Sequence, residues 1–134
     1  MKLHTHFLAD SANFNADQTF TVFKGGITVV QALSFPTIAK FVIITRLEFD
    51  ANETKKPHSM QSELTLPGGR HVTAPAQLIA LRPPEPPGTR AFANVISQMN
   101  VLLEQPGDVR IRTQVDGESL PLLYITGVKV EVIG

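Results

Sequence analysis

The residues best suited to chemistry in this chain are two histidines near its start, His4 and His6. In a β-strand, residues two positions apart lie on one face, about 7 Å apart at their side-chain origins, so two imidazoles there can share a metal ion. Asp10 continues the same face, and His58 or His71 would complete the ligand set through folding. Because the chain has no cysteine, such a site would use imidazole and carboxylate ligands. A solvated histidine pair that binds nothing is the competing interpretation.

Other catalytic chemistries find less support in the sequence. A serine hydrolase needs a nucleophile, a base and a carboxylate, but the Gly-x-Ser-x-Gly elbow is absent. Glu48, Glu53 and Glu63 are the carboxylates that could act as an acid–base pair on a sugar, yet their pattern is more typical of outward-facing charges. The chain has no tryptophan and a single tyrosine, Tyr124, so it lacks the aromatic platforms that bind sugars. No cofactor is expected.

Composition excludes several kinds of partner. Lys and Arg number 12, as do Asp and Glu, so the basic surplus that nucleic-acid binding draws on is missing. No stretch approaches the ~20 apolar residues that cross a bilayer, and the first ten residues lack the apolar run of a signal peptide. Neither nucleic acid nor membrane is therefore an expected partner, and the cytoplasm is the expected location.

Hydrophobic residues recur with period two, which is typical of half-buried strands. The clearest case is residues 40–50, where Phe41, Ile43, Leu47 and Phe49 face one way. The first half of this strand is apolar on both faces, which predicts a central strand with one end covered. Fully burying each of the four large side chains contributes roughly 1.5–3 kcal/mol.

Turn residues divide the rest of the chain into further short strands. Residues 11–18 form an expected connection, and Gly25-Gly26 an expected hairpin or bulge between residues 19–24 and 27–33. Asp116-Gly117 predicts a hairpin turn. Residues 89–103 also fit a helical stripe, but the strand-rich flanks favour a strand. Pro75 and Pro121 indicate edge positions, because proline cannot donate to a sheet ladder.

Together these elements predict one all-β domain over residues 1–134. Eight to ten strands form either a two-sheet antiparallel β-sandwich (Ig-like or jelly-roll-like) or a barrel, and the sandwich is favoured. The proline run at residues 83–87 is expected to be a rigid loop that carries the chain between the sheets. Its PxxP spacing lacks the basic flank of a docking motif.

The order of several short motifs resembles an uncharacterised bacterial family of small sandwich domains. The resemblance runs over nearly the whole chain and rests on residues 8–13, 19–26, 35–36, 44–49, 106–111 and 115–118. It implies a β-sandwich fold and a bacterial source. It carries no activity and no functional residues.

The absence of any catalytic cluster favours a non-catalytic module for protein–protein interaction or structural packing. A module that binds a small molecule or a metal is the first alternative, and a metal-assisted hydrolase is the second. A second copy of the chain is a possible partner. The candidate contact surfaces are an edge strand near Pro75 or Pro121, the face of His4, His6 and Leu8, and the apolar outer face of Val42 and Ile44.

Overall fold

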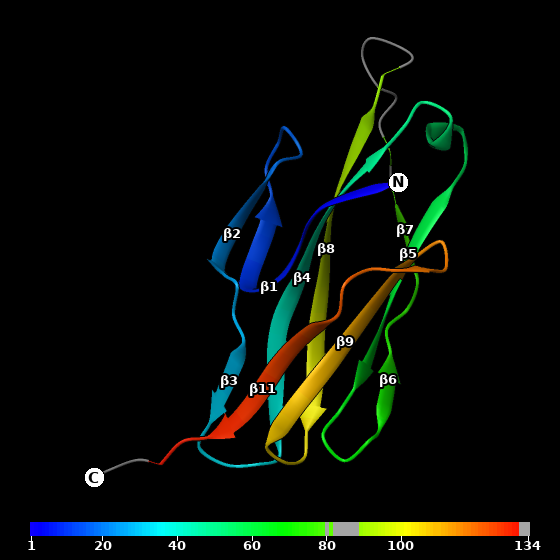
Figure 1. Cartoon of the computed structure of the whole chain (residues 1–134). Coiled ribbons are helices and arrows are strands. Elements are labelled where there is room, and N and C mark those ends of the chain that lie inside the picture. The colour runs from blue at the N-terminus through cyan, green and yellow to red at the C-terminus, as the bar shows by residue number, and fades with distance from the viewer. Residues whose placement is uncertain (80, 82–88, 132–134) are drawn as a thin grey trace.

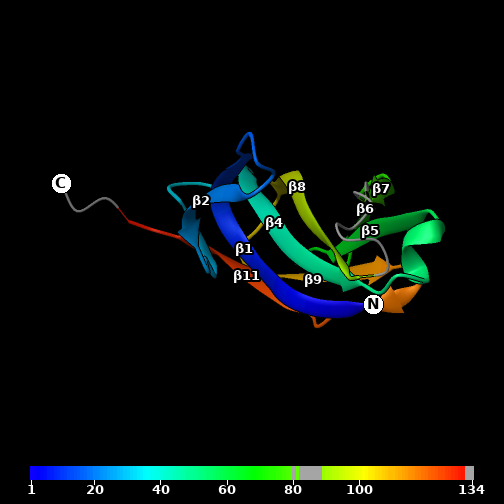
Figure 2. The same cartoon turned by 90° about the horizontal axis from the view of Figure 1, so that it is seen from above.

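A computed structural model of the chain describes residues 1–79, 81 and 89–131. In these residues eleven strands form two sheets that pack face to face (Figures 1 and 2) and do not close into a barrel. The predicted all-β sandwich is therefore confirmed, and residues 89–103, which also fitted a helix, contain a strand. The proline run at residues 83–87 lies outside the described residues.

The first sheet has the strand order β2-β1-β4-β8, and all its pairs are antiparallel. Its strands are β1 (Lys2–Phe14), β2 (Phe20–Gly25), β4 (Thr37–Phe49) and β8 (Ala91–Leu103). The second sheet has the order β3-β11-β9-β5-β6, with β7 on β5 and β10 on β9. Its strands are β3 (Val29–Ala32), β5 (His58–Thr65), β6 (His71–Thr73), β7 (Gln77–Ile79), β9 (Gly107–Val115), β10 (Glu118–Ser119) and β11 (Leu123–Lys129). A short 3-10 turn, η1 (Glu53–Lys55), precedes β5.

The core lies between the sheets and follows the predicted alternation on β4. Phe41 and Ile43 belong to one buried cluster, and Leu47 and Phe49 belong to a second one. All four side chains are almost fully removed from water. The hydrophobic effect on these inward positions is thus what holds the two sheets together.

The described strands outnumber the eight to ten that were expected, because proline breaks two of them. The segment at residues 71–81 forms two three-residue strands, β6 and β7, on either side of Pro75. The return from the Asp116-Gly117 turn is likewise divided into β10 and β11 around Pro121. The turn itself is confirmed, with φ of 51° at Asp116 and 82° at Gly117, the signs that a tight hairpin requires.

The expected hairpin or bulge at Gly25-Gly26 is wrong. The chain there leaves the first sheet and enters the second, where β3 pairs with β11 in parallel. The amides of Gly26 and Ile27 both donate to the carbonyl of Leu8, at 2.7 and 3.2 Å. Gly26 adopts a φ of 82°, which glycine reaches without steric cost, so the pair marks a change of sheet.

Strand β1 reverses direction partway along its length, as Figure 1 shows. Its first part pairs with β4 up to Ala9, and the rest pairs only with β2, so residues 11–14 are strand and not part of the predicted connection. The β1–β2 hairpin lies over the outer face of β4 and buries Val42 and Ile44 with Phe7, Phe20 and Val22. This third cluster confirms that one end of β4 is covered. It overturns the expectation that Val42 and Ile44 form a free face for self-association.

Within the described residues, no helix is long and apolar enough to span a bilayer.

Candidate functional site

A layer of polar side chains crosses the middle of the core. Each of four strands carries one buried polar residue. Along each strand, this residue lies between a neighbour in the first apolar cluster and a neighbour that belongs to the second cluster or packs against it. These residues are Thr45 on β4, Ser62 on β5, Ser97 on β8 and Thr113 on β9. The Ser62 and Thr113 hydroxyls lie 2.8 Å apart and hydrogen-bond to each other, as buried polar groups usually do.

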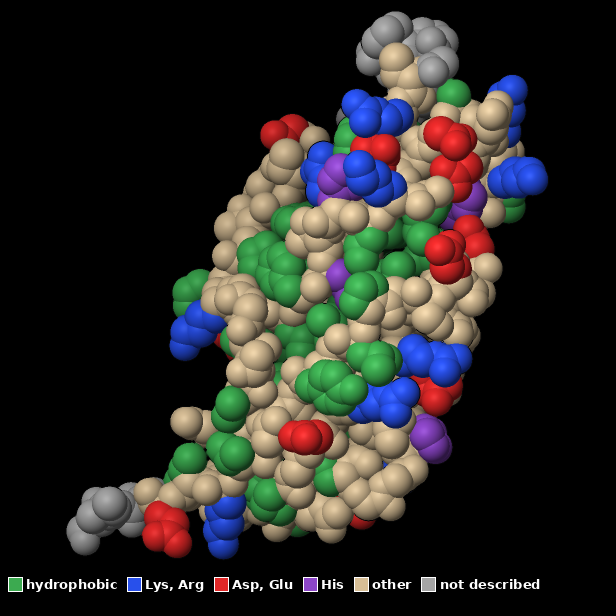
Figure 3. Space-filling view, viewed as in Figure 1, with side chains coloured by type: hydrophobic (Ala, Val, Ile, Leu, Met, Phe, Trp, Pro, Cys, Tyr) green, Lys and Arg blue, Asp and Glu red, His purple; other side chains and the backbone are tan. Residues whose placement is uncertain are grey.

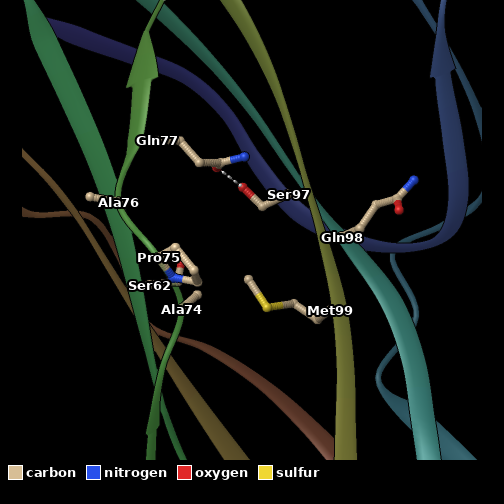
Figure 4. A pocket seen from close by; sticks show the side chains of 8 residues that line it. All are labelled: Ser62, Ala74, Pro75, Ala76, Gln77, Ser97, Gln98 and Met99. Carbon is tan, nitrogen blue, oxygen red and sulfur yellow. Dashed lines mark hydrogen bonds between the residues drawn. The ribbon is translucent and has the colours of Figure 1, made fainter.

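The polar layer opens to a cavity of about 200 Å³ beside the midpoint of β8. Figure 4 shows Ser97 and Met99 pointing from β8 towards the segment before and within β7, while Gln98 points away. The Ser97 hydroxyl donates to Gln77 Oε1 at 2.6 Å and so links the two sheets. The cavity is lined by serine and glutamine side chains and by apolar residues, with no ionisable residue in its lining.

Strand β8 forms the edge of the first sheet at this cavity. All of its 13 residues pair with β4 without a register shift, and no other described strand pairs with it. Alternate N–H and C=O groups of an edge strand point away from its single partner and can pair with another chain. One of them, the Leu102 carbonyl, accepts a 3.4 Å hydrogen bond from Arg70.

The sequence of β8 has none of the protective residues that edge strands commonly carry. Natural sheets shield their edges with charges, proline, bulges or short strands. The sequence of β8, AFANVISQMNVLL, has no charged residue, no proline and no glycine. Its outward side chains include Phe92 and Leu102, which are 42% and 44% exposed.

Several other described edge strands carry such protection. β2 contains Lys24 and Gly25, β3 has only four residues, and β6 and β7 have three each on either side of Pro75. The part of β1 that pairs only with β4 carries Lys2, two histidines and a bulge. Figure 3 shows the face over β1 and β11, where charged and hydrophobic side chains are mixed. Of these edges, β8 therefore has the least such protection among the described residues.

The two candidate metal ligands do not share a face. A bulge between Leu3 and Thr5 shifts the register of β1, so a simple alternation fails there. His4 lies on the outside, 2.9 Å from Glu48 Oε1, and its ring stands edge-on to Phe92. His6 instead points inward, where its Nδ1 is 3.0 Å from the Thr45 hydroxyl. Leu8 is also inward and buried, so the expected His4/His6/Leu8 contact face does not exist.

Burial controls the protonation of His6. Desolvation lowers its pKa from 6.5 to about 4, and its buried Nε2 has no hydrogen-bond partner among the described residues. The unfolded chain takes up this proton near pH 6.5 and the folded chain only near pH 4. Stability therefore falls as pH drops through that window, because the unfolded state then holds more protons.

We expect the change His6→Gln, which keeps a polar group near Thr45 but does not titrate, to remove the contribution of His6 to the pH dependence of stability. Between pH 7 and pH 5 the unmodified protein should lose about 1–2 kcal/mol of unfolding free energy more than the variant does. Urea unfolding of both proteins at the two pH values measures the difference. An equal pH dependence for the two proteins would show that His6 is not buried as described.

The other two histidines are engaged elsewhere. His58 is buried on β5, where Nδ1 lies 2.5 Å from Asp116 Oδ2 and Nε2 lies 2.6 Å from the Glu53 carbonyl. Burial alone lowers the pKa of His58, but the hydrogen bonds to these two acceptors outweigh it and raise that pKa. Both ring nitrogens act as donors, so His58 offers no lone pair to a metal. His71 on β6 contacts Glu63 and Thr65.

A second hollow lies where the tip of the β1–β2 hairpin approaches β4 and β8. This groove of about 630 Å³ contains Arg46, whose guanidinium lies 4.6 Å from the Phe92 ring centroid. Asn94 joins its two sides, since it accepts a hydrogen bond from Arg46 and donates one to the Gln18 carbonyl. The groove is mainly a seam between the hairpin and the sheet.

Among the described residues, no cluster of three or more His, Cys, Asp or Glu side chains could hold a metal ion. None of their serine hydroxyls is hydrogen-bonded to a histidine. The feature that sequence reasoning missed is the β8 edge, whose signal was the charge-free run over residues 91–103. Such a run also fits a buried central strand, so topology was needed to interpret it.

Comparison with known proteins gives a family without an assigned function. No curated protein matches the sequence. Residues 4–126 match the family of unknown function DUF6941, and this range spans nearly all the strands described above. The family resemblance inferred from the short motifs is thereby confirmed at the level of an uncharacterised family. The chain belongs to the family of unknown function DUF6941.

Proposed function

We propose that the protein is a non-catalytic β-sandwich module for protein–protein interaction, and that it binds by accepting a strand on the free edge of β8. The observation that carries this proposal is the unprotected edge itself: 13 residues in register with β4, without charge, proline, glycine or bulge. Strand addition supplies main-chain hydrogen bonds to such an edge, and alternate side chains give specificity. The exposed Phe92 and Leu102 side chains would supply apolar contact area.

The polar interior supports a binding role over a catalytic one. His58 is held by Asp116 and Glu53, and the Ser97 hydroxyl is held by Gln77, so these groups act in packing and not on a substrate. The cysteine-free composition suits a reducing compartment. The bacterial cytoplasm is therefore the location that we propose.

Site-specific photocrosslinking in cells of the natural source tests the β8 edge. Gln98 is exposed at the middle of β8, and a photoreactive benzoylphenylalanine in its place should give a discrete crosslinked species that mass spectrometry can identify. Gln31 on β3 is the matched control, because it is also an exposed glutamine on an edge strand. A crosslink from position 98 and none from position 31 is the expected result. No crosslink from position 98, or equal crosslinks from both, would contradict the proposal.

A further inference from the structure

We infer that the strand accepted by β8 is the β8 strand of a second copy, paired antiparallel about a two-fold axis through Ser97. This inference rests on the proposed function and names its partner. A two-fold interface must be self-complementary, because each residue meets its symmetry mate in the other copy. The sequence of β8 meets that condition.

The pattern of apolar and polar residues along β8 is nearly symmetric about Ser97. Antiparallel pairing about this residue places apolar residues opposite apolar residues and the two asparagines opposite one another. The pairs are Ala91 with Leu103, Phe92 with Leu102, Ala93 with Val101, Asn94 with Asn100, Val95 with Met99, and Ser97 with itself. Only Ile96 and Gln98 meet a residue of another class.

The self-pairing is specific to one register. An axis through Ile96 would place Phe92 opposite Asn100, and an axis through Gln98 would place Asn94 opposite Leu102. Directly opposite side chains lie on the same face of the sheet, so the axis at Ser97 pairs the exposed Phe92 of each copy with the exposed Leu102 of the other. This arrangement covers both exposed apolar side chains of β8 at once.

Charge and size also fit a second copy. No charged residue lies on β8, so the two strands meet without the like-charge repulsion that destabilises opposed residues. On the inner face, each copy brings a serine to the midpoint. That is where Gln77 of the second sheet comes within hydrogen-bond distance of β8, and a small side chain suits this position. The paired sheets would form one continuous sheet of eight strands.

Cysteine crosslinking tests the register, since the native chain has no cysteine. In an antiparallel pair, directly opposite Cα atoms are about 4.5–5.5 Å apart, within the about 4.4–6.8 Å that a disulfide spans. Under mild oxidation, Ser97→Cys should therefore be converted mostly to a covalent dimer, and the control Gln31→Cys should stay uncrosslinked. Equal crosslinking of the two variants, or none at position 97, would overturn the inference.

Analytical ultracentrifugation of the unmodified protein should show twice the 14.6 kDa chain mass. Gln98→Lys places two lysines on diagonal positions across the axis, about 7–8 Å apart, and should weaken dimerisation at least about tenfold. Gln31→Lys should leave it unchanged, and an equimolar mixture of Gln98→Lys with Gln98→Glu should restore the dimer.

The possible failures are distinguishable from one another. The protein could remain monomeric at ~100 μM, a concentration far above the Kd of stable complexes, while position 98 crosslinks to another protein. That result would overturn self-pairing but would leave the proposed function standing. A dimer that survives Gln98→Lys unchanged would show that copies associate elsewhere, which also overturns the inference. The absence of any crosslink from position 98 would contradict both the self-pairing and the proposed function.

Discussion

Replacing Phe49 with alanine should lower the free energy of unfolding by about 3–5 kcal/mol, the cost typical of a large aromatic removed from a core. Phe49 is fully buried in the second apolar cluster, and its ring stacks on His58 at 4.4 Å between centroids. The change leaves a cavity and removes the cover of a histidine that holds the η1 turn and the β9–β10 turn together. A typical domain is stable by only about 5–15 kcal/mol, so much of the total would be lost.

Urea unfolding followed by circular dichroism measures this loss. Phe23→Ala is the matched control, because Phe23 is 58% exposed on β2, and exposed substitutions of this kind change stability by about 0.5 kcal/mol or less. A loss below about 1 kcal/mol for Phe49→Ala would be incompatible with the packing described here.

The second large effect concerns the cluster outside the sandwich. Ile44→Ala should cost about 2–4 kcal/mol, because Ile44 is fully buried between β4 and the β1–β2 hairpin. The change removes part of the apolar surface against which the β1–β2 hairpin packs. Amide hydrogen exchange should therefore become faster over residues 10–14 and 20–25, and it should change less in β9. Local opening of this kind follows the loss of buried apolar contacts.

The same strand offers a closely matched control for this prediction. Ile38 lies on the same face of β4 but is 59% exposed, so Ile38→Ala should change stability by about 0.5 kcal/mol or less. Similar losses for the two isoleucines would mean that the hairpin does not cover Ile44 in solution.

Local features of the sequence were predictable because they depend on neighbours in the chain. The alternation from Phe41 to Phe49 gave the inward face of β4, since side chains in a strand alternate between faces. The Asp116-Gly117 turn followed from the backbone angles that a tight hairpin requires. The helical stripe at residues 89–103 was outweighed by its strand-rich surroundings, and β8 confirms this interpretation.

Features that depend on distant parts of the chain were not predictable. The bulge at His4 turns His6 inward, and an alternating pattern alone gives no sign of one extra residue. The reversal of β1 covers Val42 and Ile44, which from the sequence could equally have been a free face. Asp116 serves both its turn and His58 on another strand, a contact that no local pattern reveals.

The parallel pairing of β3 with β11 has a consequence for how the protein forms. Val29–Ala32 can pair only after Thr126–Lys129 has been made, so residues 33–125, about two thirds of the chain, separate the two segments that close one edge of the second sheet. A fold with such high contact order is expected to form slowly, because the entropy of closing a long loop is lost before the contacts are gained. During synthesis, the apolar side chains of β3 would stay without their strand partner until β11 has left the ribosome, and chaperone dependence at that stage is the expected outcome.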